Sequence, residues 1–288
     1  MTMSVPVNAR MMVNGKKFCF AKFLNQSSVE RVQNPDANCG NRDPLINRTA
    51  TGRRKFAFTT YHDITYPILQ ELLPLAGLTN VTGTYTANQS ALTPIAIDVD
   101  AVGAIHSFSD CRVNRFILRG QTGTLPISLE IQWIAEDETE GSPSWVDGTV
   151  DNIFAFPGAT YSINSASVDF DRFAFVIDNK LIPSWNSSVT LTDAGNGPRQ
   201  TLLATSIPYI AGTKDLYWDH RDSVAAGNDH ALVLTNGTDT VTINFPNAVF
   251  IPEGVSIEGS LEEIRLPMTW EAHRTASVAA FNLVLTNT

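Results

Sequence analysis

The sequence is short of cysteine and of charge, and it lacks the segments that would carry a chain into a membrane. Only 17% of its 288 residues are charged. Its three cysteines, Cys19, Cys39 and Cys111, are odd in number and widely spaced, which predicts neither a disulfide framework nor a metal cluster. No run of about 18 apolar residues is present, so no transmembrane helix is predicted. We expect no secretory signal and a reducing compartment.

The short motifs that carry common chemistry are also missing. The sequence contains no G-x-x-x-x-G-K-S/T, G-x-G-x-x-G, H-E-x-x-H, G-x-S-x-G or C-x-x-C. We therefore predict no enzyme, no catalytic residue, no cofactor and no metal. The nearest exception is a polar segment after residue 214, and a polar loop is the favoured interpretation over a metal site. Its acidic and histidine residues are Asp215, Asp219, His220, Asp222, Asp229 and His230.

Charge is distributed unevenly along the chain. The net charge is −9, which argues against a grip on nucleic acid. Residues 1–60 nevertheless hold ten of the 20 Lys and Arg and only three of the 29 Asp and Glu. The irregular stretch from Asn34 to Arg54 has the composition of a long arm, and it lacks the interleaved aromatic residues of a base-stacking platform. A positive arm that reaches an acidic surface on another copy of the protein is the favoured alternative to nucleic-acid binding.

Periodicity predicts one helix and many strands. The stretch HDITYPILQELLPLAG has apolar residues at helical spacing, with Asp63 as the expected N-cap and Gly77 just past the end. Downstream, PISLEIQW and EIRLPMTWE alternate apolar and polar residues, and Asn236-Gly237 marks a β-hairpin. Pro267 within the second of these strands predicts an edge or a bulge. We therefore expect a mainly β fold.

One predicted strand raises a question of burial. In VDFDRFAFVID, which starts at Val168, Asp169 and Asp171 alternate with apolar residues, and an unbroken apolar run follows from Phe173 to Ile177. A strand that is apolar on both sides must be covered on both faces.

The chain divides near its middle. The acidic, Gly- and Pro-punctuated stretch from Ala135 to Gly148 predicts a linker. On either side, a strand is followed by a turn and a return strand, which is consistent with an internal duplication. We predict a basic arm over residues 1–60, a first β half with the helix over 61–140, and a second β half over 141–288.

Several stretches together resemble the major tail tube proteins of long-tailed (siphovirus-like) bacteriophages. They are DCRVNRFILRGQTG, VIDNKLIP and the pairing of IPYI with DLYW, within a resemblance that spans about residues 60–272. The resemblance implies a β-sandwich or half-barrel with a flanking helix. It also implies hexameric rings that stack into a tube for DNA, and a virion protein assembled in the host cytoplasm.

The resemblance also implies partners and positions. A tape measure protein would lie inside the tube, with tail terminator and distal tail or baseplate proteins at its ends, transient non-specific passage of DNA and no membrane. The subunit-interface candidates are Phe173, Phe175 and Ile177. The inter-ring arm candidates are Arg42, Arg48, Arg53 and Arg54. The candidates for a negatively charged lumen are Glu130, Asp169 and Asp171.

A ligand- or carbohydrate-binding β-sandwich remains the alternative function. In that case Trp145, Trp185 and Trp218 would serve as stacking platforms, although tryptophans are more often core or interface residues.

Overall fold

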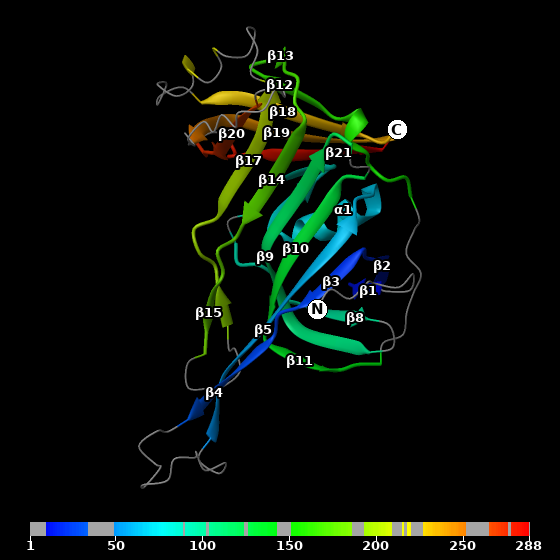
Figure 1. Cartoon of the computed structure of the whole chain (residues 1–288), viewed down its shortest axis with the longest axis vertical. Coiled ribbons are helices and arrows are strands. Elements are labelled where there is room, and N and C mark those ends of the chain that lie inside the picture. Colours follow the sequence, from blue (N-terminus) through cyan, green and yellow to red (C-terminus); the bar gives the residue numbers. More distant parts are fainter. Residues whose placement is uncertain are drawn as a thin grey trace.

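The computed structural model describes most of the chain and has a mainly β fold, as predicted (Figure 1). The described residues are 10–33, 49–88, 90–101, 104–123, 126–142, 151–185, 193–208, 215, 218–219, 227–251, 265–275 and 278–287, without the side chains of 30–33 and 49–53. Within these residues, no helix has the length and hydropathy needed to cross a membrane.

Eight antiparallel strands form one continuous sheet, which we call the main sheet. In spatial order they are β3 (Lys22–Asn25), β5 (Thr49–Asp63), β10 (Ser128–Ala135), β9 (Ile105–Gln121), β14 (Arg172–Asp178), β17 (Gln200–Pro208), β20 (Arg265–Ala272) and β19 (Asp239–Ile251). The sheet runs through both halves of the chain, because β9 of the first half pairs with β14 of the second over seven residues.

A second layer covers one face of the main sheet. In the first half it contains β1 (Arg10–Val13), β2 (Lys16–Cys19), β8 (Ile95–Asp100), β11 (Asp137–Glu140) and the N-terminal part of β9. In the second half it contains β12 (Thr160–Ile163), β13 (Ala166–Ser167), β18 (Asn228–Thr235), β21 (Asn282–Asn287) and the N-terminal part of β19. Two strands of the first half, β6 (Leu78–Val81) and β7 (Thr84–Ala87), pair with each other, and β7 pairs with β21. A turn of 3₁₀-helix, η3, spans Phe156–Gly158.

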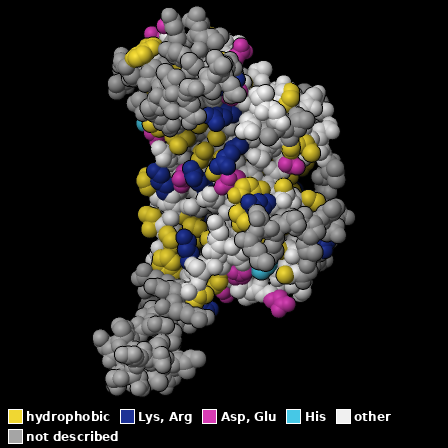
Figure 2. All heavy atoms as spheres, viewed as in Figure 1, with side chains coloured by type: hydrophobic (Ala, Val, Ile, Leu, Met, Phe, Trp, Pro, Cys, Tyr) yellow, Lys and Arg dark blue, Asp and Glu magenta, His cyan; other side chains and the backbone are white. Residues whose placement is uncertain are grey.

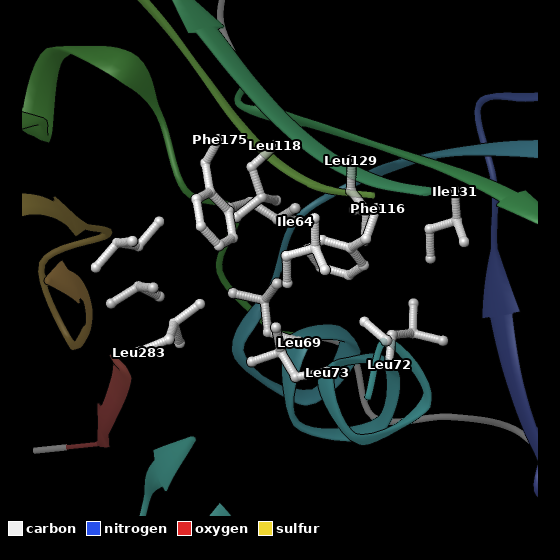
Figure 3. Packing of buried hydrophobic residues seen from close by; sticks show 14 of the residues in the cluster. Ile64, Leu69, Leu72, Leu73, Phe116, Leu118, Leu129, Ile131, Phe175 and Leu283 are labelled. Carbon is white, nitrogen blue, oxygen red and sulfur yellow. The ribbon is translucent and has the colours of Figure 1, made fainter. Parts of the chain in front are cut away.

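One hydrophobic core lies between the two layers. The residues predicted to face inward from β10 do so, since Leu129 and Ile131 are fully buried and Trp133 is 1% exposed. Helix α1 (Tyr66–Leu75) packs on the same face: Figure 3 shows Leu69 and Leu73 of the helix beside side chains of the sheet. Burial of each such side chain stabilises the fold by about 1.5–3 kcal/mol.

The helix begins later than its sequence indicated. Asp63 is the last residue of β5, and Thr65 is the N-cap, with its hydroxyl accepting a hydrogen bond from the Ile68 amide at 3.5 Å. Asp63 was therefore the wrong cap, because the strand runs on to the point where the helix starts. Gly77 follows the helix with a φ of +86°, as expected of a residue just past a helix end.

Other boundaries differ in the same way. The predicted strand from Val168 starts only at Arg172, since the backbone at 168–171 is outside the ladder. In the predicted linker, Asp137–Glu140 forms β11 against β9, so part of that stretch is a paired strand.

The hairpin at Gly237 is confirmed between β18 and β19. Pro267 pairs with Ser206 of β17, and the residues that would continue β19 opposite it lie outside the described residues, so its position at an edge or a bulge stays a prediction.

The two halves repeat one topology. In the main sheet, β3-β5-β10-β9 is followed by β14-β17-β20-β19, with the same order along the chain in each group. In the second layer, β1 pairs with β2 and β8 as β12 pairs with β13 and β18. The pairings of β8 with β9 and of β18 with β19 also share an irregularity at the same place. The topology supports the internal duplication that the sequence only suggested.

The repeat can be followed residue by residue. Phe20 and Lys22-Phe23 align with Phe170 and Arg172-Phe173, 150 positions later, and Trp133 aligns with Trp270, 137 positions later. The turn after β1 (Asn14, φ 50°) has its counterpart after β12 (Asn164, φ 50°). The alignment places the strands at residues 10–25 and 54–60 within the first repeat.

Candidate assembly surface

The main sheet has one face that points away from the core. We call it the outer face. It carries the residues that alternate with the core residues along each strand, among them Ser128 and Glu130 on β10, Arg119 on β9, and Ala174 on β14. Figure 2 shows basic, acidic and hydrophobic side chains mixed over this side of the molecule.

Opposite charges pair between neighbouring segments on this face. Arg119 Nη1 lies 3.0 Å from Glu130 Oε2. Arg115 Nε lies 3.7 Å from Asp178 Oδ2, on residues that are register partners between β9 and β14. Glu130 also accepts a hydrogen bond from Gln132 Nε2 at 2.9 Å. These pairs balance the charge locally, so the described centre of the outer face is not strongly negative.

The edge of the same face continues this pattern at β5. Lys22 Nζ lies 5.1 Å from the centre of the Tyr61 ring, within the range of a cation–π contact. The pKa of Tyr61 is raised, first by burial and then by the charge of Glu130. Tyr61 is therefore a neutral phenol at neutral pH and contributes a polar but uncharged group to the outer face.

A shallow groove of about 610 Å³ lies where the two halves meet. Small residues, Ala174, Ala204 and Ser128, line it together with Arg119 and Arg172. Asp63 is the one carboxylate in its lining, which contains no histidine or cysteine, so it offers no acid–base pair or nucleophile. The groove is suited to contact and not to catalysis.

The predicted subunit-interface residues lie inside the chain's own core. Phe173 is 3% exposed, and Phe175 and Ile177 are fully buried, packed with α1 and the second layer. Their assignment to a subunit surface is wrong, because they are covered within one chain. On the opposite face of β14, Val176 is 8% exposed and is register partner to Ile117 and Leu202, so the sheet itself covers most of that face.

Of the predicted lumen residues, the structure brings only Asp169 and Asp171 close together. Glu130 lies on the outer face but is 9% exposed beneath its ion pair with Arg119. Asp171 Oδ2 pairs with Arg265 Nη1 at 3.3 Å. Asp169 is exposed and lies with Asp171 in a smaller hollow before β14 begins. Alternation within one strand does not identify the pairing arginines, because Arg119 lies on the neighbouring strand β9 and Arg265 lies on β20, far away in the chain.

The predicted arm is partly described. The hairpin of β4 (Ser28–Gln33) with the N-terminal part of β5 projects from the main sheet (Figure 1). Arg42 and Arg48 lie outside the described residues, and so does the side chain of Arg53. Arg54 is half-buried, and its Nε has no hydrogen-bond partner within the described part of the chain. A matching short hairpin, β15 (Ile182–Ser184) with β16 (Asp193–Gly195), projects from the second half.

The polar segment singled out in the sequence is largely outside the described residues, including His220 and Asp222. In the part that is described, Asp215, Asp219 and Asp229 are exposed, and His230 is buried with Nδ1 2.7 Å from the Tyr161 hydroxyl. No group of three metal-ligating side chains occurs among the described residues.

The tryptophans proposed as sugar platforms have different surroundings. Trp185 donates its indole N–H to the Arg54 carbonyl at 2.8 Å and packs against a small cluster of Leu92, Ile134, Leu181 and Ala194. Trp218 is 48% exposed, and Trp145 lies outside the described residues. Trp185 therefore joins the second half to the first, which is a structural use of its ring.

Comparison with known proteins identifies the family. A family model described as phage tail tube protein matches residues 20–272. The match starts about forty residues earlier than the resemblance seen in the sequence, between β2 and β3 of the first repeat. No curated protein matches the chain.

Proposed function

The chain belongs to the phage tail tube protein family, whose members are structural proteins of the tail and not enzymes. From this premise we propose that its copies form rings that stack into the tail tube, with three chains and six repeats in each ring in place of the six chains that the resemblance implied. The observation that carries the proposal is the main sheet, which is continuous through both halves of the chain. Among the described residues, β3 at one end and the last residues of β19 at the other are paired along one edge only. Strand edges of this kind are satisfied when copies join into a closed barrel.

In this proposal the sixfold ring consists of six four-stranded units. Each chain supplies two such units, so three chains provide six units. With strands about 4.8 Å apart and tilted by about 40°, 24 strands close a barrel about 50 Å across, and 48 strands one about 100 Å across. The narrower barrel leaves a bore suited to a single DNA duplex once side chains are added.

We place the outer face on the bore, because the opposite face of the main sheet is buried beneath the second layer. Glu130 and Asp171 then lie at the bore in ion pairs, with Asp169 exposed beside them. A lining of paired charges presents no cationic surface that would bind the DNA phosphates, and no uniformly negative surface that would repel them. DNA would pass without being held.

The remaining parts of the proposal concern contacts beyond one ring. The basic arm, with Arg42, Arg48, Arg53 and Arg54, would contact the adjacent ring. The predicted division at residue 140 would separate the two repeats, whereas the division at residue 60 would cut through the first repeat, to which β1, β2, β3 and the end of β5 belong. A tape measure protein would occupy the bore before DNA, and terminator and distal tail proteins would close the ends. Assembly would take place in the host cytoplasm.

Purified protein tests this proposal. We expect rings and tubes by negative-stain electron microscopy, and a ring mass of three times the 31.4 kDa of one chain, against six times for six chains. Deletion of residues 36–52 should leave single rings and prevent stacking. A chain that remains monomeric at high concentration, in low and in high salt, would contradict the proposal.

A further inference from the structure

Arg199 is a half-buried arginine without a carboxylate partner. It lies immediately before β17, and its Nε donates to Asn179 Oδ1 at 2.9 Å. Among the described residues, no acidic side chain forms an ion pair with it. Four other arginines, on β9 and β20, do form ion pairs: Arg112, Arg115, Arg119 and Arg265. A guanidinium keeps its charge at neutral pH, so burying it without a counter-ion costs free energy. The same burial lowers the pKa of Arg199.

The neighbours of Arg199 hold its guanidinium in one place. Asn179 is 3% exposed, and its Nδ2 donates to the carbonyls of Val113 at 2.9 Å and Ala76 at 3.3 Å, which leaves Oδ1 for Arg199. The guanidinium also fills the space beside Gly77, because a Cβ added there would lie 2.3 Å from Arg199 Nη2. An amide and a glycine therefore position this cation before any ligand binds, which lowers the cost of binding.

A small polar hollow lies beside Arg199, where residues of the two halves meet. Its volume is about 190 Å³. Apart from Arg199 its lining is neutral, with no carboxylate, and consists of Asn88, Ser90, Asn179, Asn196, Gly197 and Pro198. A hollow below about 300 Å³ is smaller than the pockets that hold drug-sized ligands, so it suits a group of a few heavy atoms.

The lining offers donors for an anion. Asn88 Oδ1 accepts from the Ser90 N–H at 2.8 Å, and no acceptor for Asn88 Nδ2 occurs in the described part of the chain. The Arg199 guanidinium has five N–H donors, and only its Nε has an acceptor among the residues described. Donors of this kind form strong, charge-assisted hydrogen bonds with oxyanions.

The end of helix α1 does not replace the missing counter-ion. A helix C-terminus carries a partial negative charge that stabilises a nearby cation. The carbonyls of Leu72, Leu73 and Pro74 at this end already accept hydrogen bonds from backbone N–H groups. The helix therefore reduces the cost of burying Arg199, but it leaves the other guanidinium donors without acceptors.

We propose that this hollow binds a small oxyanion, namely a phosphate, sulfate or carboxylate group, which accepts hydrogen bonds from the Arg199 guanidinium and the Asn88 amide. Asn88 belongs to the first half of the chain and Arg199 to the second, so the bound anion stabilises the junction between them. This inference goes beyond the proposed function, because the site lies within one chain and does not depend on ring formation.

Thermal unfolding of the full-length chain tests the site. Sodium phosphate and sodium acetate at pH 7 are each compared with sodium chloride at the same ionic strength, which separates binding from screening. We expect a dissociation constant of about 1–10 mM for phosphate, as a few charge-assisted hydrogen bonds can provide. At ten times that concentration, the unfolding equilibrium constant should fall about elevenfold. Acetate, which represents a carboxylate ligand, should act more weakly because it carries less charge.

Variants assign the effect to Arg199. Arg199→Gln should weaken phosphate binding at least about tenfold, judged from the shift relative to the melting temperature of the variant itself. The matched control is Arg274→Gln, which changes an exposed arginine and should bind phosphate as the unmodified chain does.

A second variant places a carboxylate in the hollow and does not require the loss of Arg199. Asn88→Asp keeps an acceptor for the Ser90 N–H, so it should raise the melting temperature without added anion and abolish the response to phosphate. Equal stabilisation by chloride would overturn the inference. A full response to phosphate in Arg199→Gln or in Asn88→Asp would overturn it as well.

Discussion

Equivalent strands of the two halves of the molecule differ in how they are paired. In the second half, β14 is an interior strand of the main sheet, paired on both sides. In the first half, the equivalent β3 is an edge strand. The comparison shows that equivalent strands of two similar repeats can differ in the number of edges that are paired within the chain.

The clearest difference concerns one alignment position. Asn179 is 3% exposed, and its side-chain amide donates to the carbonyls of Val113 at 2.9 Å and Ala76 at 3.3 Å. It also accepts the hydrogen bond from Arg199. Val29, 150 positions earlier, is the equivalent residue of the first repeat and is 50% exposed, and among the described residues no strand other than β5 pairs with β3 or β4 there. Asn179 satisfies polar groups that burial at the junction would otherwise leave unpaired.

Replacing Asn179 by the residue of the other half should therefore have the largest effect. Asn179→Val leaves two carbonyls and the Arg199 guanidinium without their partner, and we expect a loss of about 3 kcal/mol in the free energy of unfolding. The reverse change, Val29→Asn, is on the surface of the monomer and should cost less than about 0.5 kcal/mol. Urea denaturation of monomeric protein measures both. A cost below about 1 kcal/mol for Asn179→Val would show that the junction does not depend on this amide.

A second difference lies in the core. His62 of the first half occupies the place of Ile207 in the second. Burial lowers the pKa of His62 to about 4, although its ring lies 3.1 Å from the Cys19 carbonyl. The folded chain therefore holds a neutral histidine that the unfolded chain protonates below about pH 6.5. Stability from this group is complete above that pH and is lost as the pH falls toward 4.

His62→Ile should make the first half resemble the second and remove this pH dependence. Between pH 7 and pH 5, the unmodified chain should lose about 2 kcal/mol more than the variant, at about 1.4 kcal/mol per pH unit below pH 6.5. Thermal or urea unfolding across this range measures the difference. The control is His273→Asn on the surface, which should keep the slope of the unmodified chain. Equal slopes for His62→Ile and the unmodified chain would exclude His62 as the cause.

The smallest expected effect concerns the ion pairs of the outer face. Arg115 and Asp178 join the two halves, whereas Arg119 and Glu130 lie within the first half. The Arg115 and Arg119 side chains are 40% and 54% exposed, so each pair should contribute less than about 1 kcal/mol. Double-mutant cycles with Arg115→Gln and Asp178→Asn, and with Arg119→Gln and Glu130→Gln, measure the two couplings. Both should shrink in 1 M salt, where screening acts over about 3 Å. A coupling above about 2 kcal/mol at the junction would show that charge pairing holds the halves together.

Local pattern in the sequence was sufficient for the elements with strong periodicity. Alternation in PISLEIQW placed Leu129, Ile131 and Trp133 in the core, and Gly237 marked the hairpin between β18 and β19. The helix was found, but its cap was misplaced, since Asp63 and Thr65 are both good caps and only the length of β5 distinguishes them. The apolar run from Phe173 to Ile177 correctly indicated a strand covered on both faces.

What covers that strand was beyond the sequence. The phenylalanines pack within the chain because β9, β17 and the second layer, contributed by residues far away in the chain, close around them. The ion pair of Asp171 was missed for the same reason, since Arg265 is far away in the chain, whereas that of Glu130 was missed because Arg119 lies across the turn on the neighbouring strand β9.

The sequence by itself determined the mainly β class, the separation of wet and dry faces on each strand and the family to which the chain belongs, because these depend on residue types at short spacing. The tertiary structure alone decided which strand edges are paired and which remain open. The pairing that joins the two halves, between β9 and β14, depends on contacts between residues more than fifty positions apart, and the two repeats differ at this edge although their other pairings agree.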